Sequence, residues 1–175
     1  MFQQLGHFVI TELQKELHKN GVSWKKWIID YPMIFDEKDQ QYLRSQSQYG
    51  YLLFGSLTAI FIYNSTGYIP VFGSYFNKGH VRKRKIVKSI VSPATWDLLE
   101  NMKEWECQPP DVFAYAPDES DYFFCEAKGP GDKIRPKQEK YFRELERVSG
   151  KPVYTVTYKL APFGKKQPGQ VHKMV

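Results

Sequence analysis

The sequence has few cysteines and no long apolar segment. Two cysteines, Cys107 and Cys125, are too few for a disulfide framework, and the apolar run around Cys125 favours a reduced, buried thiol over a bridge. The longest apolar run, Leu52 to Tyr63, is interrupted by glycine and hydroxyl residues and is too short to span a membrane. The residues after Met1 lack the basic start and apolar core of a signal peptide. We therefore expect a cytoplasmic protein without a membrane partner.

Several functional signatures are also missing. The four histidines lack the spacing of a metal site, and Gly129-Pro-Gly131 lacks the longer glycine pattern of a nucleotide-binding loop. No internal repeat is visible. The chain does have a basic balance of 25 Lys and Arg against 19 Asp and Glu, a net charge of +6. Such a charge suits a polyanionic partner, either nucleic acid or an acidic membrane face.

Composition and periodicity predict one α/β domain over residues 1–160, followed by a basic tail over 161–175. The 175 residues fit a single core, and 42% of them are apolar. Apolar residues at helical spacing predict a helix over 2–19. The stretch 58–72 is typical of a β-hairpin, with Pro70 suiting an edge strand. Ser92-Pro93 predicts a helix that begins there and runs to about residue 106.

The last third of the sequence has the clearest pattern. Two apolar strands within 112–128 flank a turn at Pro117–Ser120 and form a predicted hairpin. A helix over 136–148 closes at Gly150, and a strand over 152–158 follows. These elements supply the positions of the candidate functional residues.

Three charged residues converge at one end of this hairpin. Side chains alternate along a strand, so Glu126 and Lys128 share one face, and antiparallel pairing returns the chain toward Asp111. Two carboxylates within reach repel each other unless a cation lies between them. An all-oxygen site with room for water suits Mg²⁺ or Mn²⁺. A lysine beside that ion can orient or help deprotonate a water, as phosphodiester hydrolysis requires.

The spacing by itself leaves a plainer alternative open. Asp36-Glu37-Lys38 contains the same acid-x-Lys triplet without any supporting neighbours. A Glu and a Lys two apart on a strand also commonly form a solvated surface pair. The residues around the triplet must therefore decide between the two interpretations.

Those surroundings resemble a known family. Pro110-Asp111, followed by the run from Phe124 to Gln138, resembles the VRR-NUC branch of the PD-(D/E)xK nuclease superfamily, which includes the nuclease domain of the Fanconi-associated nuclease. The shared elements are a Pro-Asp, a strand ending Glu-x-Lys-Gly-Pro, a following Asp and a Lys-Gln that opens a helix. The resemblance covers roughly residues 109–158. Ala127 replaces the usual Val, and Arg135 stands where a capping Ser is common.

The resemblance implies a restriction-endonuclease-like fold: a mixed β-sheet flanked by helices, with residues 57–91 as an inserted β-rich elaboration. It implies a Mg²⁺- or Mn²⁺-dependent endonuclease acting on DNA, selective for branched or junction structures, and it leaves a homodimer open. The alternative functions are those of a non-catalytic nucleic-acid-binding protein or of a regulatory protein, either of which would keep the nuclease fold.

The same resemblance assigns roles to individual residues. Asp111, Glu126 and the Ala127 carbonyl would ligate the metal, Lys128 would be the catalytic lysine, and Gln138 would hold the water or phosphate. The superfamily often adds a glutamate from its first helix. Glu12 is our choice over Glu16, and a surface salt bridge is the alternative for either.

A basic run is the candidate DNA-binding segment. No acid offsets its cations, which suit contacts to phosphates, although lysines on a solvated edge strand are an equally good interpretation. Two further lysines lie in the segment that carries the resemblance. The candidate DNA-binding residues are Arg82, Lys83, Arg84, Lys85, Lys88, Lys133 and Lys137.

Overall fold

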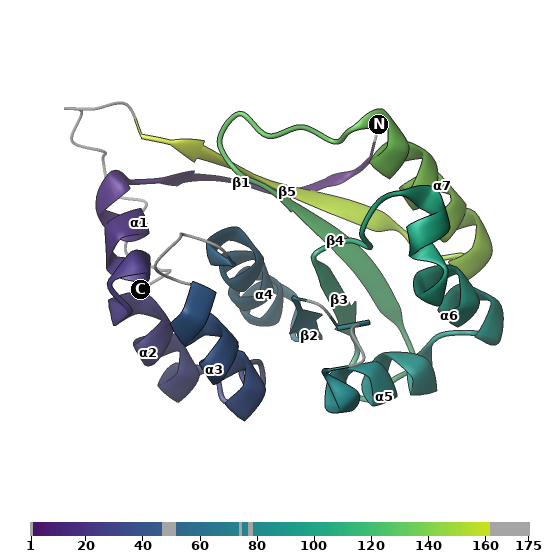
Figure 1. Cartoon of the computed structure of the whole chain (residues 1–175), viewed down its shortest axis with the longest axis horizontal. Helices are drawn as coiled ribbons and strands as arrows, with labels where there is room; N and C mark the ends of the chain where they lie inside the picture. Colours follow the sequence, from purple (N-terminus) through teal and green to yellow (C-terminus); the bar gives the residue numbers. More distant parts are fainter. Residues whose placement is uncertain (1, 47–51, 74, 77–78, 162–175) are drawn as a thin grey trace.

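A five-stranded mixed sheet organises the chain. The computed structural model describes residues 2–46, 52–73, 75–76 and 79–161. The strand order is β1-β5-β4-β3-β2, with β1, β5 and β4 parallel and β3 antiparallel to both of its neighbours (Figure 1). The strands are β1 (Gln4–Ile10), β2 (Ile69–Phe72), β3 (Val112–Tyr115), β4 (Tyr122–Lys128) and β5 (Val153–Leu160).

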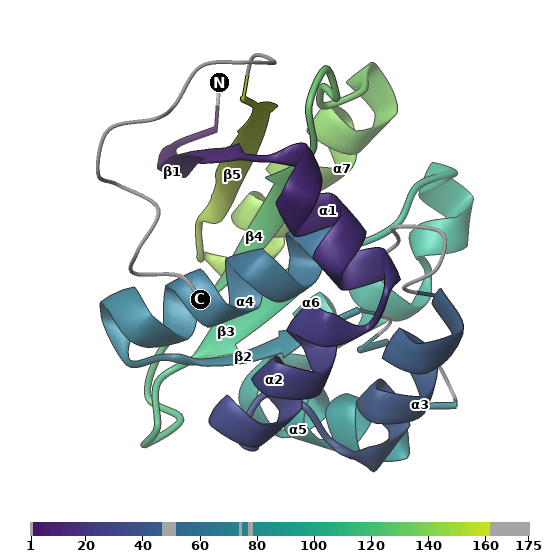
Figure 2. The same ribbon diagram turned by 90° about the vertical axis from the view of Figure 1, so that its left-hand side faces the viewer.

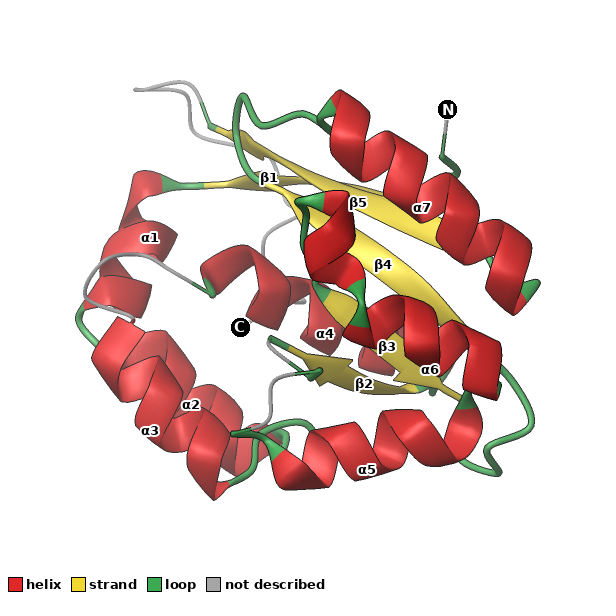
Figure 3. Ribbon diagram, turned by 45° about the vertical axis from the view of Figure 1, so that its right-hand side comes forward, coloured by secondary structure: helices red, strands yellow, loops and turns green. Residues whose placement is uncertain are grey.

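Helices cover both faces of this sheet (Figure 3). On one face, α4 packs against β2, β3 and β4, and the N-terminal helices α1, α2 and α3 lie beyond it (Figure 2). On the other face lie α5, α6, a 3₁₀ turn η2, and α7. The helices are α1 (Glu12–Lys19), α2 (Val22–Asp30), α3 (Glu37–Gln46), α4 (Leu53–Thr66), α5 (Val81–Ile90), α6 (Pro93–Glu100), η2 (Met102–Trp105) and α7 (Pro136–Ser149).

The alternation along β4 divides the core into two halves. Phe123, Cys125 and Ala127 pack in the cluster on the α4 face. Tyr122 and Phe124 pack in the cluster on the α7 face, with aromatic residues of α7. Because Glu126 and Lys128 continue the second series, α7 is the helix that can reach them.

The predictions for the last third of the chain are confirmed. The hairpin 112–128 is β3 and β4, the helix over 136–148 is α7, and the strand over 152–158 is β5. Pro70 lies in β2, which is an edge strand. The restriction-endonuclease-like mixed sheet with flanking helices is also confirmed.

The predicted helix over 2–19 is wrong in its first half. Residues 4–10 form β1, which pairs in parallel with β5, and only 12–19 are helical. Thr11 caps α1: its hydroxyl accepts from the Gln14 N–H at 3.1 Å, and the Gln14 side chain accepts from the Thr11 N–H at 2.8 Å. This Thr-x-x-Gln capping box marks the helix start and separates strand from helix.

The β-rich elaboration over 57–91 is also wrong in its details. Only β2 is a strand there, because the predicted first strand belongs to α4 and the basic run forms α5. The turn signal before Tyr68 is the end of α4, where Gly67 adopts a left-handed conformation with φ 73°. The β-branched and aromatic residues of α4 have low helix propensity. The burial of α4 between the sheet and α2 outweighs that propensity. The edge-strand interpretation of the basic run is therefore excluded.

Two further expectations concern the ends of the chain and the membrane. The basic tail over 161–175 lies outside the described residues, apart from Ala161. Within the described ranges, no helix has the length and apolar character needed to cross a membrane.

Candidate active site

Asp111 and Glu126 lie side by side at the end of the hairpin. Val112 pairs with Cys125, so the next residues outward, Asp111 and Glu126, face each other. The Asp111 N–H donates to Oε2 of Glu126 at 3.3 Å, and the Ala127 N–H donates to Oδ2 of Asp111 at 2.9 Å. Strand alternation and pairing thus bring the two carboxylates together as the sequence predicts.

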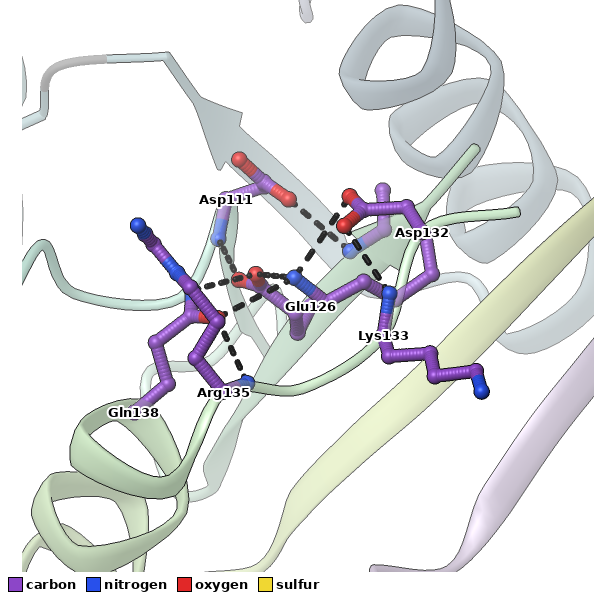
Figure 4. Close-up of polar contacts among 8 residues, drawn as sticks. Asp111, Glu126, Asp132, Lys133, Arg135 and Gln138 are labelled. Carbon is purple, nitrogen blue, oxygen red and sulfur yellow. Dashed lines mark hydrogen bonds and ion pairs between the residues drawn. The ribbon is translucent and has the colours of Figure 1, made fainter. Parts of the chain in front are cut away.

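Lys128 and Gln138 complete a buried network around Glu126 (Figure 4). Nζ of Lys128 lies 2.8 Å from Oε1 of Glu126 and donates to Oε1 of Gln138 at 3.3 Å. Nε2 of Gln138 donates to the same Glu126 oxygen at 3.1 Å. Pro136 begins α7, and its first turn places Gln138 over β4. Gln138 therefore holds both the acid and the base of the Glu-x-Lys pair in position.

Two residues of this network had no role in the sequence analysis. Oδ2 of Asp132 lies 3.7 Å from Nζ of Lys128, on the exposed side of the lysine. The Arg135 N–H donates to Oε1 of Gln138 at 3.2 Å, which fixes the amide orientation. The sequence feature that could have pointed to Asp132 and Arg135 is their position between Lys128 and Gln138 in the motif segment. Sequence alone does not tell which residues of that loop turn toward the site.

The two carboxylates strain each other electrostatically. Burial and the neighbouring Glu126 carboxylate raise the pKa of Asp111. Burial also raises the pKa of Glu126, and the Lys128 ammonium offsets this only in part. Two acids placed this closely favour sharing a proton or a cation over standing charged together.

A solvent-open cavity of about 410 Å³ lies directly beside these acids. Asp111 keeps part of its surface exposed at this wall, although protein surrounds its carboxyl closely enough to raise its pKa, so the site faces outward and a phosphate has a route to it. The wall is otherwise built from apolar side chains, glycines and a loop. Its lining residues are Leu52, Phe54, Gly55, Phe72, Gly73, Asp111, Ala127, Gly129, Pro130 and Asp132.

The donor atoms fit a hard divalent ion. Asp111 and Glu126 supply carboxylate oxygens, and Ala127 adds its backbone carbonyl at the same strand end, an all-oxygen set that suits Mg²⁺ or Mn²⁺. Among the described residues, no three His, Cys, Asp or Glu side chains gather closely enough to enclose an ion. An ion held here would therefore keep several waters, which is the usual state of protein-bound Mg²⁺.

The structure does not bring Glu12 to this site. Glu12 begins α1, is half exposed, and pairs with Lys15 at 3.3 Å. β1, which leads into α1, is separated from β4 by β5. Glu16 likewise forms an exposed pair with Lys19. The surface salt bridge is thus the interpretation that fits both glutamates, and α4, which borders the cavity, contains no acid.

The candidate DNA-binding cations have different environments. Lys83 is 1% exposed and bonded to Asp39 and to the Phe72 carbonyl, so its assignment as a DNA contact is wrong. Arg84 is occupied by the Phe76 carbonyl and Glu100. The other five candidates have exposed side chains: Arg82, Lys85, Lys88, Lys133 and Lys137. Two of them form surface ion pairs, Arg82 with Asp36 and Lys137 with Glu106.

Comparison with known families agrees with this geometry. The profile of the VRR-NUC domain matches residues 63–157, which is more than half of the chain. The match includes α7, all of β2, β3 and β4, and the larger part of β5. No curated protein matches the sequence. The chain therefore belongs to the VRR-NUC domain family, a branch of the PD-(D/E)xK nuclease superfamily.

Proposed function

We propose that this nuclease-family protein is a metal-dependent endonuclease that hydrolyses phosphodiester bonds in DNA and prefers branched DNA or junctions. The observation that carries the proposal is the meeting of Asp111, at the wall of an open cavity, with the buried Glu126, which in turn contacts Lys128. Binding alone does not require two mutually repelling carboxylates at a surface where a phosphate must approach. The repulsion between the two carboxylates costs stability, and a cation held between them would remove that cost.

Asp111, Glu126 and the Ala127 carbonyl would hold Mg²⁺ or Mn²⁺. When bound, such an ion polarises the scissile phosphate and lowers the pKa of an attacking water. The Ala127 N–H bond to Asp111 keeps that carboxylate at the cavity wall, so little reorganisation is needed before metal or substrate arrives.

Lys128 and Gln138 would act on the water and the phosphate. The Lys128 ammonium lies between Glu126 and Asp132, from where it can donate to a water or to a non-bridging phosphate oxygen. Gln138 restrains Nζ of Lys128 and Oε1 of Glu126 through one amide. The exposed cations Lys133 and Lys137, in the loop and first turn beside the site, would contact the DNA backbone.

The proposal is tested with a panel of end-labelled linear, nicked, flapped and four-way DNAs incubated in Mg²⁺, Mn²⁺ or Ca²⁺. We expect cleavage by the native chain in Mg²⁺ or Mn²⁺, with branched DNA cut best, and none by Asp111→Asn. Glu12→Gln serves as the matched acid control and should cut like the native chain. Salt-sensitive DNA binding with no cleavage in any metal would instead favour a non-catalytic nucleic-acid-binding protein.

A further inference from the structure

The acid pair has chemically different surroundings on its two sides. In Figure 4, Arg135 and Gln138 lie on one side of Glu126 and Asp132 lies on the other. The first side leads to the exposed Lys137 at the start of α7, while Lys133 extends from the Asp132 side of the loop. The second side is the cavity, whose lining among the described residues contains no Lys or Arg. The scissile phosphate must reach the acids themselves, while the cavity beyond Asp111 offers no cation among its described lining residues to hold further phosphates.

The cavity has an apolar wall that is held in place by packing. Phe54, from the first turn of α4, lines the cavity and is only partly buried. Its ring lies 5.0 Å from the ring of Tyr158, between centroids. A Cβ at Gly129 would come within 2.7 Å of the Phe54 ring, so only glycine lets that ring sit there. Phe54 thus presents a fixed aromatic surface to the cavity beside Asp111.

The remaining lining fits an uncharged planar group. Leu52 and Phe72 add apolar surface, while Gly55 and Gly73 leave space. Among the described lining residues, the polar side chains are those of Asp111 and Asp132, whose carboxylates can accept hydrogen bonds from such a group. The volume of about 410 Å³ falls in the range of pockets for small organic groups, roughly 300–1,000 Å³. In a nucleic acid, the matching group is a base that has left the stack.

We propose that this cavity receives one unstacked nucleobase next to the scissile phosphate, with Phe54 as its stacking surface. The inference rests on the proposed nuclease function and names its substrate class: DNA with an unpaired nucleotide at the cleavage site. Stacking on an aromatic ring tolerates any base, because every base has a π-face. The resulting selectivity is for local structure and not for sequence.

The test compares three duplexes of identical sequence: fully paired, with one unpaired nucleotide, and with an abasic residue at that same unpaired position. Binding of the full chain is measured in Ca²⁺ by fluorescence anisotropy, and cleavage is measured in Mg²⁺. We expect the duplex with the unpaired base to be bound about 5- to 150-fold more tightly than the abasic one, the range that base–aromatic stacking gives.

Phe54→Leu should remove that difference, because leucine keeps apolar bulk without a flat ring. Phe61→Leu, on the same helix but packed against Phe8, is the matched control and should keep it. Thermal unfolding confirms that each variant is folded. Equal affinity of the native chain for the unpaired-base and abasic duplexes overturns the inference, even if both are cleaved. Absence of cleavage in Mg²⁺ contradicts the nuclease proposal, while the binding comparison still decides the base site.

Discussion

At the scale of single residues, the site depends on one unfavourable contact and the groups that offset it. Asp111 and Glu126 face each other across the hairpin, and burial and mutual repulsion raise the pKa of Asp111. Lys128 and Gln138 contact Glu126 directly, whereas the Ala127 N–H and the charge of Lys128 offset the cost at Asp111 only in part. We propose that a bound metal ion removes the remaining cost of this pair.

Stabilisation of the chain by Mg²⁺ should grow as the pH rises. A carboxyl whose folded pKa lies above its unfolded value costs stability as the pH rises from the unfolded pKa through the folded pKa. Metal binding removes that cost and competes with the proton, so the melting temperature in Mg²⁺ minus that without metal should be larger at about pH 8 than at about pH 6. Asp111→Asn should show no such pH-dependent gain. A gain in the variant equal to that of the native chain would place the ion elsewhere.

Lys128→Ala should separate catalysis from binding. Loss of one preorganised donor to a developing charge typically costs about 10²- to 10³-fold in rate, so we expect cleavage to fall by that factor. DNA affinity in Ca²⁺ should change little, because Nζ lies in a 6% exposed residue and not on the outer surface. Joint loss of binding and cleavage would assign Lys128 to DNA anchoring.

At the scale of elements, a buried ion pair joins the N-terminal helix α3 to the part of the sheet that borders the candidate active site. Lys83 of α5 bonds to Asp39 of α3 and donates to the Phe72 carbonyl at 2.8 Å, at the end of β2. The next residue, Gly73, donates its N–H to the Asp111 carbonyl at 3.1 Å. Residues outside the family match thus help to hold the backbone that carries Asp111.

Asp39→Ala should be severely destabilising. It leaves the Lys83 ammonium buried without its carboxylate, a change that typically costs about 3–5 kcal/mol. Glu12→Ala removes a half-exposed pair and should cost no more than about 1 kcal/mol. Urea unfolding of both variants measures the two free energies. Similar small losses would show that Lys83 finds another partner or loses its proton at little cost.

The same elements show what local signals can and cannot predict. The hairpin and α7 were predictable because alternation, the turn at 117–120, Pro136 and Gly150 are encoded within a few residues. β1 was mistaken for a helix because its identity depends on pairing with β5, about 150 residues later. The burial of Lys83 depends on Asp39, which is 44 residues away. Non-local contacts of this kind leave no periodicity in the sequence.

At the scale of the whole molecule, we propose that residues 1–160 fold as one domain. The family match begins at residue 63, yet α2 and α3 share a hydrophobic cluster with α4 and with all five strands of the sheet. We expect a single unfolding transition in urea, with tryptophan fluorescence and far-UV circular dichroism coincident. Trp24 and Trp27 report the N-terminal helices, and Trp96 reports the opposite face. Two separated transitions would divide the N-terminal region from the nuclease core.

Mn²⁺ binding measured by titration calorimetry tests most directly whether Asp111 and Glu126 hold a cation, as the proposed function requires. The native chain and Glu12→Gln should bind Mn²⁺ with the same affinity. Asp111→Asn and Glu126→Gln should each bind at least about tenfold more weakly, since each loses a charged ligand. Unchanged Mn²⁺ affinity in both acid variants would contradict the account, because the ion would then be held by other residues.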